Sequence, residues 1–330
     1  MSKQRNKQEP ELSVRRASPD KINSQIDLSV EIAGVRFKNP VIAASGTFGF
    51  GKEYNEIFDV SCLGGICTKG LTLHPREGNS GTRIWETPAG LLNSIGLENP
   101  GIEVFLEQEL PRLREMGPAV IANLSGSTIE EYACGAALLD QSSVDMIELN
   151  ISCPNVKAGG MTFGLDPHMA RSVLEQTRRA CPHKPLMVKL SPNAPDLAAV
   201  AQSCINAGAD ALSLVNTFKA MAIDIKKRKP VFDNISAGLS GPAIRPIALR
   251  MVWELCRALT GPADRPKVPV IGMGGIACAE DALEFLLAGS AAIQVGSAAF
   301  ANPLAMPEII NGIEYYMRER GYTNISQLSV

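Results

Sequence analysis

Eight short apolar runs, separated by segments with helical periodicity, constrain the fold of this chain more than any other feature. The runs are PVIAAS from residue 40, GGICTKG from 64, AVIANLS from 119, VDMIELN from 144, PLMVKL from 185, DALSLVN from 210, VPVIGMGG from 268 and AAIQVGS from 291. Because they are continuous rather than alternating, they are typical of strands buried on both faces under helices. Eight such strand–helix units in series predict an α/β fold, a (β/α)8 TIM barrel. An open doubly wound sheet is the alternative, but no GxGxxG motif follows the first run.

The segments between the runs carry helix signals. From residue 195 to 208, apolar residues recur on one helical stripe, and Gly208 is expected to end that helix. Ser127 with Glu130 predicts a capping box, and Asp166-Pro167 predicts another helix start. Before the first run, LSVEIAGVRFK predicts a small N-terminal hairpin that plugs the barrel floor.

The composition bounds the class of protein. With 330 residues, 45% of them hydrophobic, the chain can bury one large barrel core. Its formal charge is only -2 and it has no Lys/Arg block, so nucleic acid is not an expected partner. Residues 1–26 are polar and mixed in charge, which predicts a disordered tail ahead of a single catalytic domain over 27–330. No stretch approaches the roughly 20 apolar residues of a membrane span, so a cytoplasmic protein is expected.

The cysteines and histidines give no metal signature. Eight Cys and three His form no CxxC pair, HExxH motif or other zinc spacing, so no metal site is expected. Cys67, Cys134, Cys204 and Cys256 fall within strands or helices and are predicted to be small core residues. Cys153 differs, because it follows the fourth run in NISCPNVKAGG, where a thiol can act as a base or a nucleophile.

Polar and glycine residues close nearly every run, and in a TIM barrel the carboxyl ends of the strands form the catalytic mouth. They are Ser45-Gly46, Thr68-Lys69-Gly70, Asn123, Asn150, Lys189, Asn216-Thr217, Gly274-Gly275 and Gly296-Ser297. The connections at 70–100, 151–165 and 217–241 are longer than a barrel needs, and long loops in compact domains are usually functional. We therefore expect extended active-site loops that act as lids.

The residue types at this mouth indicate a phosphate-bearing ligand. The glycine turns GMGGI (272–276) and VGSA (295–298), each before a helix, let backbone N–H groups approach a phosphate. Lys189 suits compensation of negative charge on a reduced cofactor, although Lys69 or Lys189 could instead form a Schiff base. Amide groups that can read a polar, planar ligand come from Asn93, Asn123, Asn150 and Asn216.

Together these segments resemble the class 1B dihydroorotate dehydrogenases, specifically the catalytic subunit that binds flavin mononucleotide (FMN). The resemblance covers roughly residues 27–310 and rests on ASGTFGFGKEY (44–54), TKGLT to ETPAGLLNSIGLENPG (68–101), ELNISCPNVKAGG (148–160), VKLSPN (188–193), LVNT (214–217), LSGPAIRPIALRMV (239–252), IGMGGI (271–276) and DALEFLLAG (281–289).

The resemblance implies a function and a set of site residues. It implies oxidation of (S)-dihydroorotate to orotate in pyrimidine (UMP) biosynthesis, with Cys153 as the general base and hydride transfer to one FMN per chain. The implied FMN contacts are Ser45, Lys69, Gly70, Asn123, Asn150, Lys189, Val215, Gly241, Gly274, Gly275, Gly296 and Ser297. The implied substrate contacts are Lys69, Asn93, Ser94, Ile95, Gly96, Leu97, Asn150, Asn216 and Thr217.

It also implies partners. Class 1B enzymes pass electrons to NAD through a second subunit that carries FAD and an iron–sulfur cluster. This sequence has no four-cysteine cluster motif and no dinucleotide fingerprint, so that route requires a partner chain. A homodimer core within a heterotetramer is expected. Lys219, Ala220 and Ala237 stand where the family pattern suggests glycines, which leaves the mobility of the lid open.

Three other functions fit parts of the pattern. A dihydropyrimidine dehydrogenase-like flavoenzyme would use a similar site, but its uracil substrate has no carboxylate for Lys69. A Schiff-base phosphosugar lyase would use Lys69 or Lys189 and bind no flavin. A catalytically silent barrel would be indifferent to replacement of Cys153.

Overall fold

The computed structural model describes residues 26–151, 163–260 and 268–328. The predicted tail, apart from Ile26, lies outside these residues, and so does Cys153. None of the helices in the described part of the chain is both long and apolar enough to traverse a bilayer.

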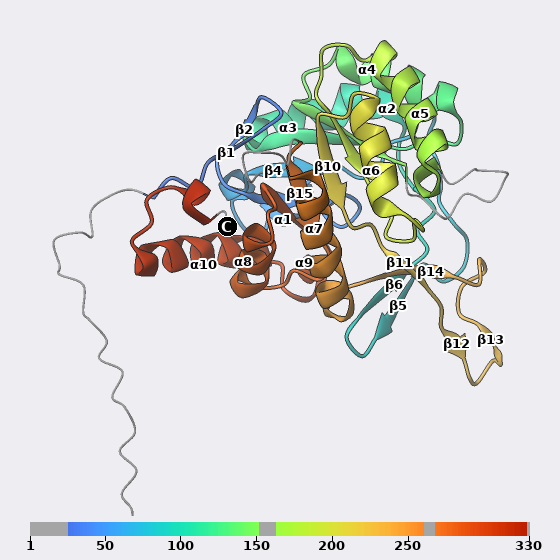
Figure 1. Cartoon of the computed structure of the whole chain (residues 1–330). Coiled ribbons are helices and arrows are strands. Elements are labelled where there is room, and N and C mark those ends of the chain that lie inside the picture. The colour runs from blue at the N-terminus through green and yellow to red at the C-terminus, as the bar shows by residue number, and fades with distance from the viewer. Residues whose placement is uncertain (1–25, 152–162, 261–267, 329–330) are drawn as a thin grey trace, which may run out of the picture.

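Eight parallel strands close into a barrel, which confirms the predicted TIM-barrel fold and excludes the open sheet (Figure 1). The strands are β3 (Val41–Ala43), β4 (Gly65–Cys67), β7 (Ala119–Leu124), β8 (Met146–Asn150), β9 (Leu186–Lys189), β10 (Ala211–Leu214), β15 (Val270–Met273) and β16 (Ala292–Val295). Each lies within one of the eight apolar runs. The ring runs β3-β4-β7-β8-β9-β10-β15-β16 and closes by pairing of β16 with β3.

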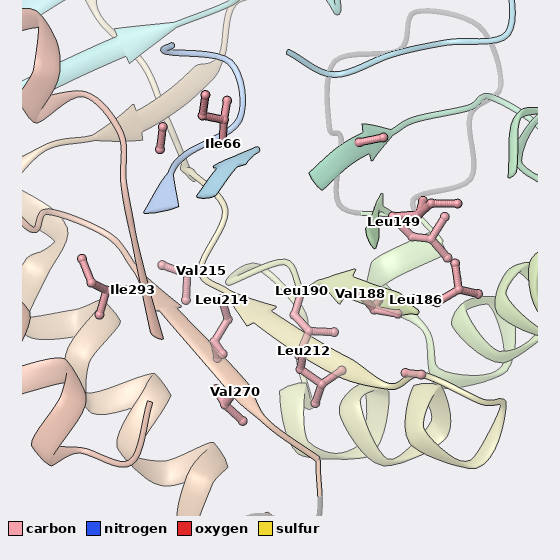
Figure 2. Close-up of a cluster of buried hydrophobic side chains, with 14 of the residues drawn as sticks. Ile66, Leu149, Leu186, Val188, Leu190, Leu212, Leu214, Val215, Val270 and Ile293 are labelled. Carbon is pink, nitrogen blue, oxygen red and sulfur yellow. The ribbon is translucent and has the colours of Figure 1, made fainter. Parts of the chain in front are cut away.

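The two faces of each barrel strand have different neighbours. Side chains such as Val188, Leu212 and Val270 belong to the large cluster that packs with the surrounding helices (Figure 2). On each strand, the residues that alternate with these outer ones point into the barrel, because successive side chains of a strand lie on opposite faces. At the amino ends these inner residues are apolar, among them Ile121, Met146 and Met187.

The predicted N-terminal hairpin is present and plugs the floor of the barrel. Strands β1 (Val30–Ile32) and β2 (Val35–Phe37) pair antiparallel, and Ile32 and Phe37 pack against the inner apolar residues at the amino ends of the barrel strands. Both side chains are 1% exposed. This end of the barrel is therefore a packed core.

Helices follow the strands as expected. They are α1 (Lys52–Asn55), α2 (Ile102–Val104), a π-helical turn (Phe105–Glu109), α3 (Leu110–Met116), α4 (Ile129–Asp140), α5 (Pro167–Ala180), α6 (Leu197–Asn206), α7 (Arg245–Leu259), α8 (Ala279–Leu287), α9 (Ala298–Ala301) and α10 (Ala305–Arg320). Single 3-10 turns lie at Val60–Cys62, Phe163–Leu165, Pro242–Ile244 and Ile325–Leu328.

Two local predictions on α4 are wrong. The helix begins one residue later than Ser127 implied: Thr128 is the cap, accepting from the Glu131 N–H, while the Glu131 carboxylate accepts from the Ser127 N–H. Cys134 is exposed rather than in the core, because α4 buries the stripe of Tyr132, Gly135, Ala136 and Leu139 on its other face. Cys67, Cys204 and Cys256 are buried as predicted.

Two of the long connections combine into one sheet instead of forming separate loops. The first contains β5 (Ile84–Thr87) and β6 (Gly90–Asn93), and the second contains β11 (Phe218–Ala220) and β14 (Ala237–Ser240), paired in the order β11-β14-β6-β5. A small ribbon, β12 (Ile223–Asp224) with β13 (Lys229–Pro230), extends from the second. We call the four-stranded sheet the lid sheet. Figure 1 shows it at the end of the barrel opposite to β1 and β2.

Candidate active site

A pocket opens at the carboxyl ends of the barrel strands, on the side of the lid sheet. All predicted site residues within the described ranges line it except Asn123 and Ser94. The predicted residues in its wall are Ser45, Lys69, Gly70, Asn93, Ile95, Gly96, Leu97, Asn150, Lys189, Val215, Asn216, Thr217, Gly241, Gly274, Gly275, Gly296 and Ser297. Residues from both ends of the sequence therefore meet at one concave surface, as the barrel topology requires.

The lid sheet supplies one wall of this pocket. Asn93 donates from Nδ2 to the Gly238 carbonyl at 3.2 Å, which fixes the amide at the junction of β6 and β14. Ser94 instead lies behind the wall, 2% exposed, where its Oγ accepts from Asn79 at 3.1 Å and Asn234 at 3.4 Å. Ser94 thus joins the two long connections to each other.

The two glycine turns lie side by side on another wall. Gly274 and Gly275 have φ angles of +126° and +78°, which side-chain-bearing residues rarely adopt. A Cβ on Gly275 would stand 2.8 Å from Arg245 Cβ and from the Gly241 carbonyl oxygen. The backbone N–H groups of Gly275 and Gly296 donate to no described residue, although both glycines line the pocket. These groups can therefore donate to an anionic ligand.

Beneath the pocket floor, the barrel interior is polar instead of apolar. Glu148 on β8 is fully buried, and donors from five other strands surround its carboxylate. Its Oε1 accepts from Ser213 Oγ at 2.7 Å and Gln294 Nε2 at 2.9 Å. Its Oε2 accepts from Asn123 Nδ2 at 2.6 Å and Cys67 Sγ at 3.1 Å. We call Glu148 and these four partners, together with Lys189, the polar layer.

Lys189 connects the polar layer to the pocket. Its Nζ lies 3.9 Å from Glu148 Oε2, and its side chain is 8% exposed. That distance is an ion pair without a close hydrogen bond, so the ammonium donors can still serve a ligand. Lys69 lines the same pocket and forms no ion pair with a described residue.

The pKa values within the polar layer follow from this arrangement. Burial by itself raises the pKa of Glu148, but the Lys189 ammonium and the hydrogen bonds from Ser213, Cys67 and Gln294 outweigh it, so the net shift is downward. Burial and the Glu148 carboxylate raise the pKa of Cys67 well above its ordinary value. Glu148 is therefore ionised and Cys67 is a neutral thiol, which excludes Cys67 as a nucleophile at neutral pH.

Two buried oxygens of the polar layer, Asn123 Oδ1 and Gln294 Oε1, have no hydrogen-bond partner among the described residues. Gln294 lines the pocket. Asn123 Oδ1 lies beside Gly70, which lines the pocket as well, and would be 3.1 Å from a Cβ at that position. Unsatisfied buried acceptors next to a pocket are expected where a ligand donates hydrogen bonds.

Within the described residues, no group of three or more His, Cys, Asp or Glu side chains is arranged to hold a metal ion.

Comparison with known proteins decides the family. A family model described as dihydroorotate dehydrogenase matches residues 27–317. The curated protein of Petrotoga mobilis is 57% identical over 303 residues, which cover 92% of this chain and 98% of the relative. Those of Geotalea daltonii (52% identical, 92% and 97% covered) and Thermoanaerobacter pseudethanolicus (50%, 92% and 98%) are similar over the same length. All three are named dihydroorotate dehydrogenase B (NAD(+)), catalytic subunit. The chain belongs to the dihydroorotate dehydrogenase family.

Membership of the dihydroorotate dehydrogenase family confirms the resemblance drawn from the sequence motifs and makes the chain an oxidoreductase. It argues against a Schiff-base lyase. It also favours a substrate with a carboxylate over uracil, since the relatives carry the dihydroorotate name.

Sequence reasoning missed the centre of the polar layer in this dehydrogenase. Glu148, Ser213 and Gln294 each have apolar neighbours on both sides in the sequence, so the run pattern does not single them out. Each of the three lies just before the polar carboxyl end of its strand. A single polar residue in that place is the signal that could have found them. Other pocket residues without such a signal are Ile84, Leu91, Ser240, Met273 and Phe300.

Proposed function

We propose that this chain oxidises (S)-dihydroorotate to orotate in pyrimidine (UMP) biosynthesis, as the catalytic subunit of an NAD-linked dihydroorotate dehydrogenase that uses FMN. The observation that carries the proposal is one pocket that joins the glycine turns of β15 and β16 to the amides and ammonium groups of the opposite strands. The family and the names of the relatives support the reaction.

The residues of the pocket fit FMN. The free N–H groups of Gly275 and Gly296 suit phosphate oxygens, and the absence of a side chain at Gly274 and Gly275 leaves room for a close approach. Lys189, with Asn123 and Gln294 nearby, would hold the ring. The remaining proposed contacts are Ser45, Lys69, Gly70, Asn150, Val215, Gly241 and Ser297. When bound, FMN supplies an acceptor for a hydride.

The lid side of the pocket fits a carboxylated pyrimidine. Lys69 provides a positive charge for the carboxylate, and amides can pair with the ring N–H and C=O groups. Asn216 donates from Nδ2 to Asn150 Oδ1 at 3.2 Å, and its own Oδ1 accepts from the Thr217 N–H at 2.8 Å, so these groups are held before a substrate enters. Asn93, Ile95, Gly96 and Leu97 would complete the substrate site from the lid sheet. Ser94 contributes by holding Asn79 and Asn234, not by lining the pocket.

Cys153 is the proposed general base. Oxidation of dihydroorotate requires a proton to leave one ring carbon while a hydride leaves the adjacent carbon. A base positioned at the first carbon lowers the activation barrier of this reaction. Cys153 follows the end of β8 by three positions, and Asn150 at that end lines the pocket. The connection that carries Cys153 therefore starts at the pocket wall.

The electrons would leave through a partner. The relatives are named catalytic subunits of NAD(+)-dependent enzymes, which supports a second subunit for this chain as well. We propose that this subunit carries FAD and an iron–sulfur cluster, and that two copies of this chain form the core of a heterotetramer. The proposed location is the cytoplasm.

Purification of the chain alone tests the proposal. We expect a yellow protein that releases FMN on denaturation and oxidises dihydroorotate with a dye acceptor, but reduces NAD only after the partner subunit is added. A colourless protein, or one that turns over dihydrouracil and not dihydroorotate, would contradict the proposal. NAD reduction by this chain alone would contradict the partner assignment only.

A further inference from the structure

Within the described part of the chain, each group that contacts the buried Glu148 carboxylate through a hydrogen bond or an ion pair is a donor. Two neutral donors reach each of its oxygens, the Cys67 thiol being the weakest of the four, and the Lys189 ammonium adds a charge. An ionised carboxylate offers about four acceptor positions, so its capacity is filled. Only the ionised form satisfies this arrangement.

Such a group is unusual in this place. The interior of a TIM barrel is ordinarily filled with branched apolar side chains, and burial of an ion pair is often no more stabilising than apolar residues of similar volume. In this chain the layer below, with Ile121 and Met146, does follow that rule. Folding alone therefore does not explain why a charge pair stands directly beneath the pocket.

We propose that Glu148 is a positioning residue of the dehydrogenase, which holds the Lys189 ammonium at the pocket floor and offsets its charge there. The inference rests on the proposed function, because the ligand at issue is the flavin. Lys189 and Ser213 are register partners on β9 and β10, so the Glu148 carboxylate on β8 is tied to the adjacent strand β9 and to β10 beyond it. The same carboxylate fixes the amide groups of Asn123 and Gln294 by accepting from both.

The charge pair has a consequence for the cofactor. Reduction adds negative charge to a flavin, which an unopposed ammonium would stabilise strongly and a compensated pair stabilises less. Removal of the carboxylate should therefore increase the affinity for reduced FMN relative to oxidised FMN. We expect Glu148→Gln to raise this ratio at least tenfold, which is about 30 mV for a two-electron couple.

The experiment measures the reduction potential of bound FMN, and the FMN dissociation constant, across a pH series. In Glu148→Gln the potential should be above that of the wild type throughout the series. Glu148→Asp keeps the charge and should stay nearer the wild type. Ser213→Ala is the matched control, since it removes one neutral donor and leaves the ion pair.

A double variant separates positioning from packing. If Glu148 acts through Lys189, Glu148→Gln in a Lys189→Met background should leave the potential where Lys189→Met alone puts it. Equal potentials for Glu148→Gln and the wild type at every pH, or an equal shift in Ser213→Ala, would overturn the inference. If Glu148→Gln does not fold, Glu148→Asp is compared with Lys189→Met. The inference is overturned if Glu148→Asp shifts the potential from the wild-type value as far as Lys189→Met does. A wild type that binds no flavin would instead contradict the proposed function.

Discussion

Gly275 and Gly296 lie on the same wall of the pocket, yet the surrounding protein would accept a side chain at only one of them. Gly275 has φ +78° and no space for a Cβ, whereas the nearest atom to a Cβ on Gly296 is Ala44 Cβ at an ordinary 3.6 Å. The fold thus requires glycine at the first position. At the second position, only a bound ligand would require glycine.

This difference gives a prediction for two alanine variants. Gly275→Ala should lower the free energy of unfolding by about 1–3 kcal/mol, because its backbone conformation is strained for alanine. Gly296→Ala should unfold like the wild type but bind FMN more weakly, because its methyl group takes space near the proposed phosphate. Denaturant unfolding of the apoproteins and FMN titration measure the two effects. Unchanged FMN affinity in Gly296→Ala would remove this glycine from the proposed site.

Cys153 gives a second prediction at the residue scale. Cys153→Ala should reduce kcat for dihydroorotate by about 10²–10⁴-fold, the range typical for loss of a positioned base. Bound FMN should remain. Cys134→Ala is the control, since that thiol is exposed on α4 and should leave kcat unchanged. Dye-linked turnover measures both variants, and wild-type turnover in Cys153→Ala would show that another group is the base.

Between elements, Asp140 ties the end of α4 to the connection between α5 and β9. Its side chain is 1% exposed. It accepts from the His183 ring at 2.7 Å, from the His183 and Lys184 N–H groups at 3.0 and 2.9 Å, and from the Cys181 thiol at 3.1 Å. Burial raises the pKa of Asp140, but these hydrogen bonds outweigh it and lower the pKa to about 2.

The depressed pKa predicts a pH-dependent contribution to stability. Because the folded pKa is below the ordinary value of 3.8, the stabilisation is complete above that value and is lost as the pH falls toward 2. At one pKa unit per 1.36 kcal/mol, it amounts to about 2 kcal/mol at pH 7. At pH 7 the free energy of unfolding of Asp140→Asn should be lower than that of the wild type by about that amount. Below pH 4 this difference between the two proteins should decrease. Unfolding curves over this range measure it, and a gap that does not change with pH would refute the assignment.

The elements differ in how far the sequence predicts them. The eight strands were predictable because burial on both sides leaves uninterrupted apolar runs, and the pocket was predictable because the barrel gathers the strand ends. The role of Glu148 was not predictable from the sequence, because the direction of its side chain depends on the strand register around the ring. The lid sheet was not either, because β6 and β14 pair across more than a hundred residues and no local pattern specifies that partner.

For the molecule as a whole, the N-terminal hairpin acts as a closure of the barrel floor. Phe37 is 1% exposed and packs so tightly that a Cβ on Gly65 would stand 2.9 Å from its ring. Phe37→Ala should destabilise the entire domain by about 3–5 kcal/mol, as expected for a large core side chain. Since the pocket is at the other end, kcat per folded molecule should not change. Arg36→Ala, at an exposed neighbouring position, is the control. Thermal unfolding together with turnover at low temperature measures both effects.

The lid sheet begins from strands on opposite sides of the ring. Its inner pair, β6 and β14, belongs to the connections that leave β4 and β10, and these strands stand four places apart in a ring of eight. The sheet is therefore a bridge across the diameter of the mouth, and neither half can be exchanged alone. A chimera that takes residues 70–100 from a relative would have to take 217–241 from the same donor, so the two segments should be inherited and engineered as one cassette.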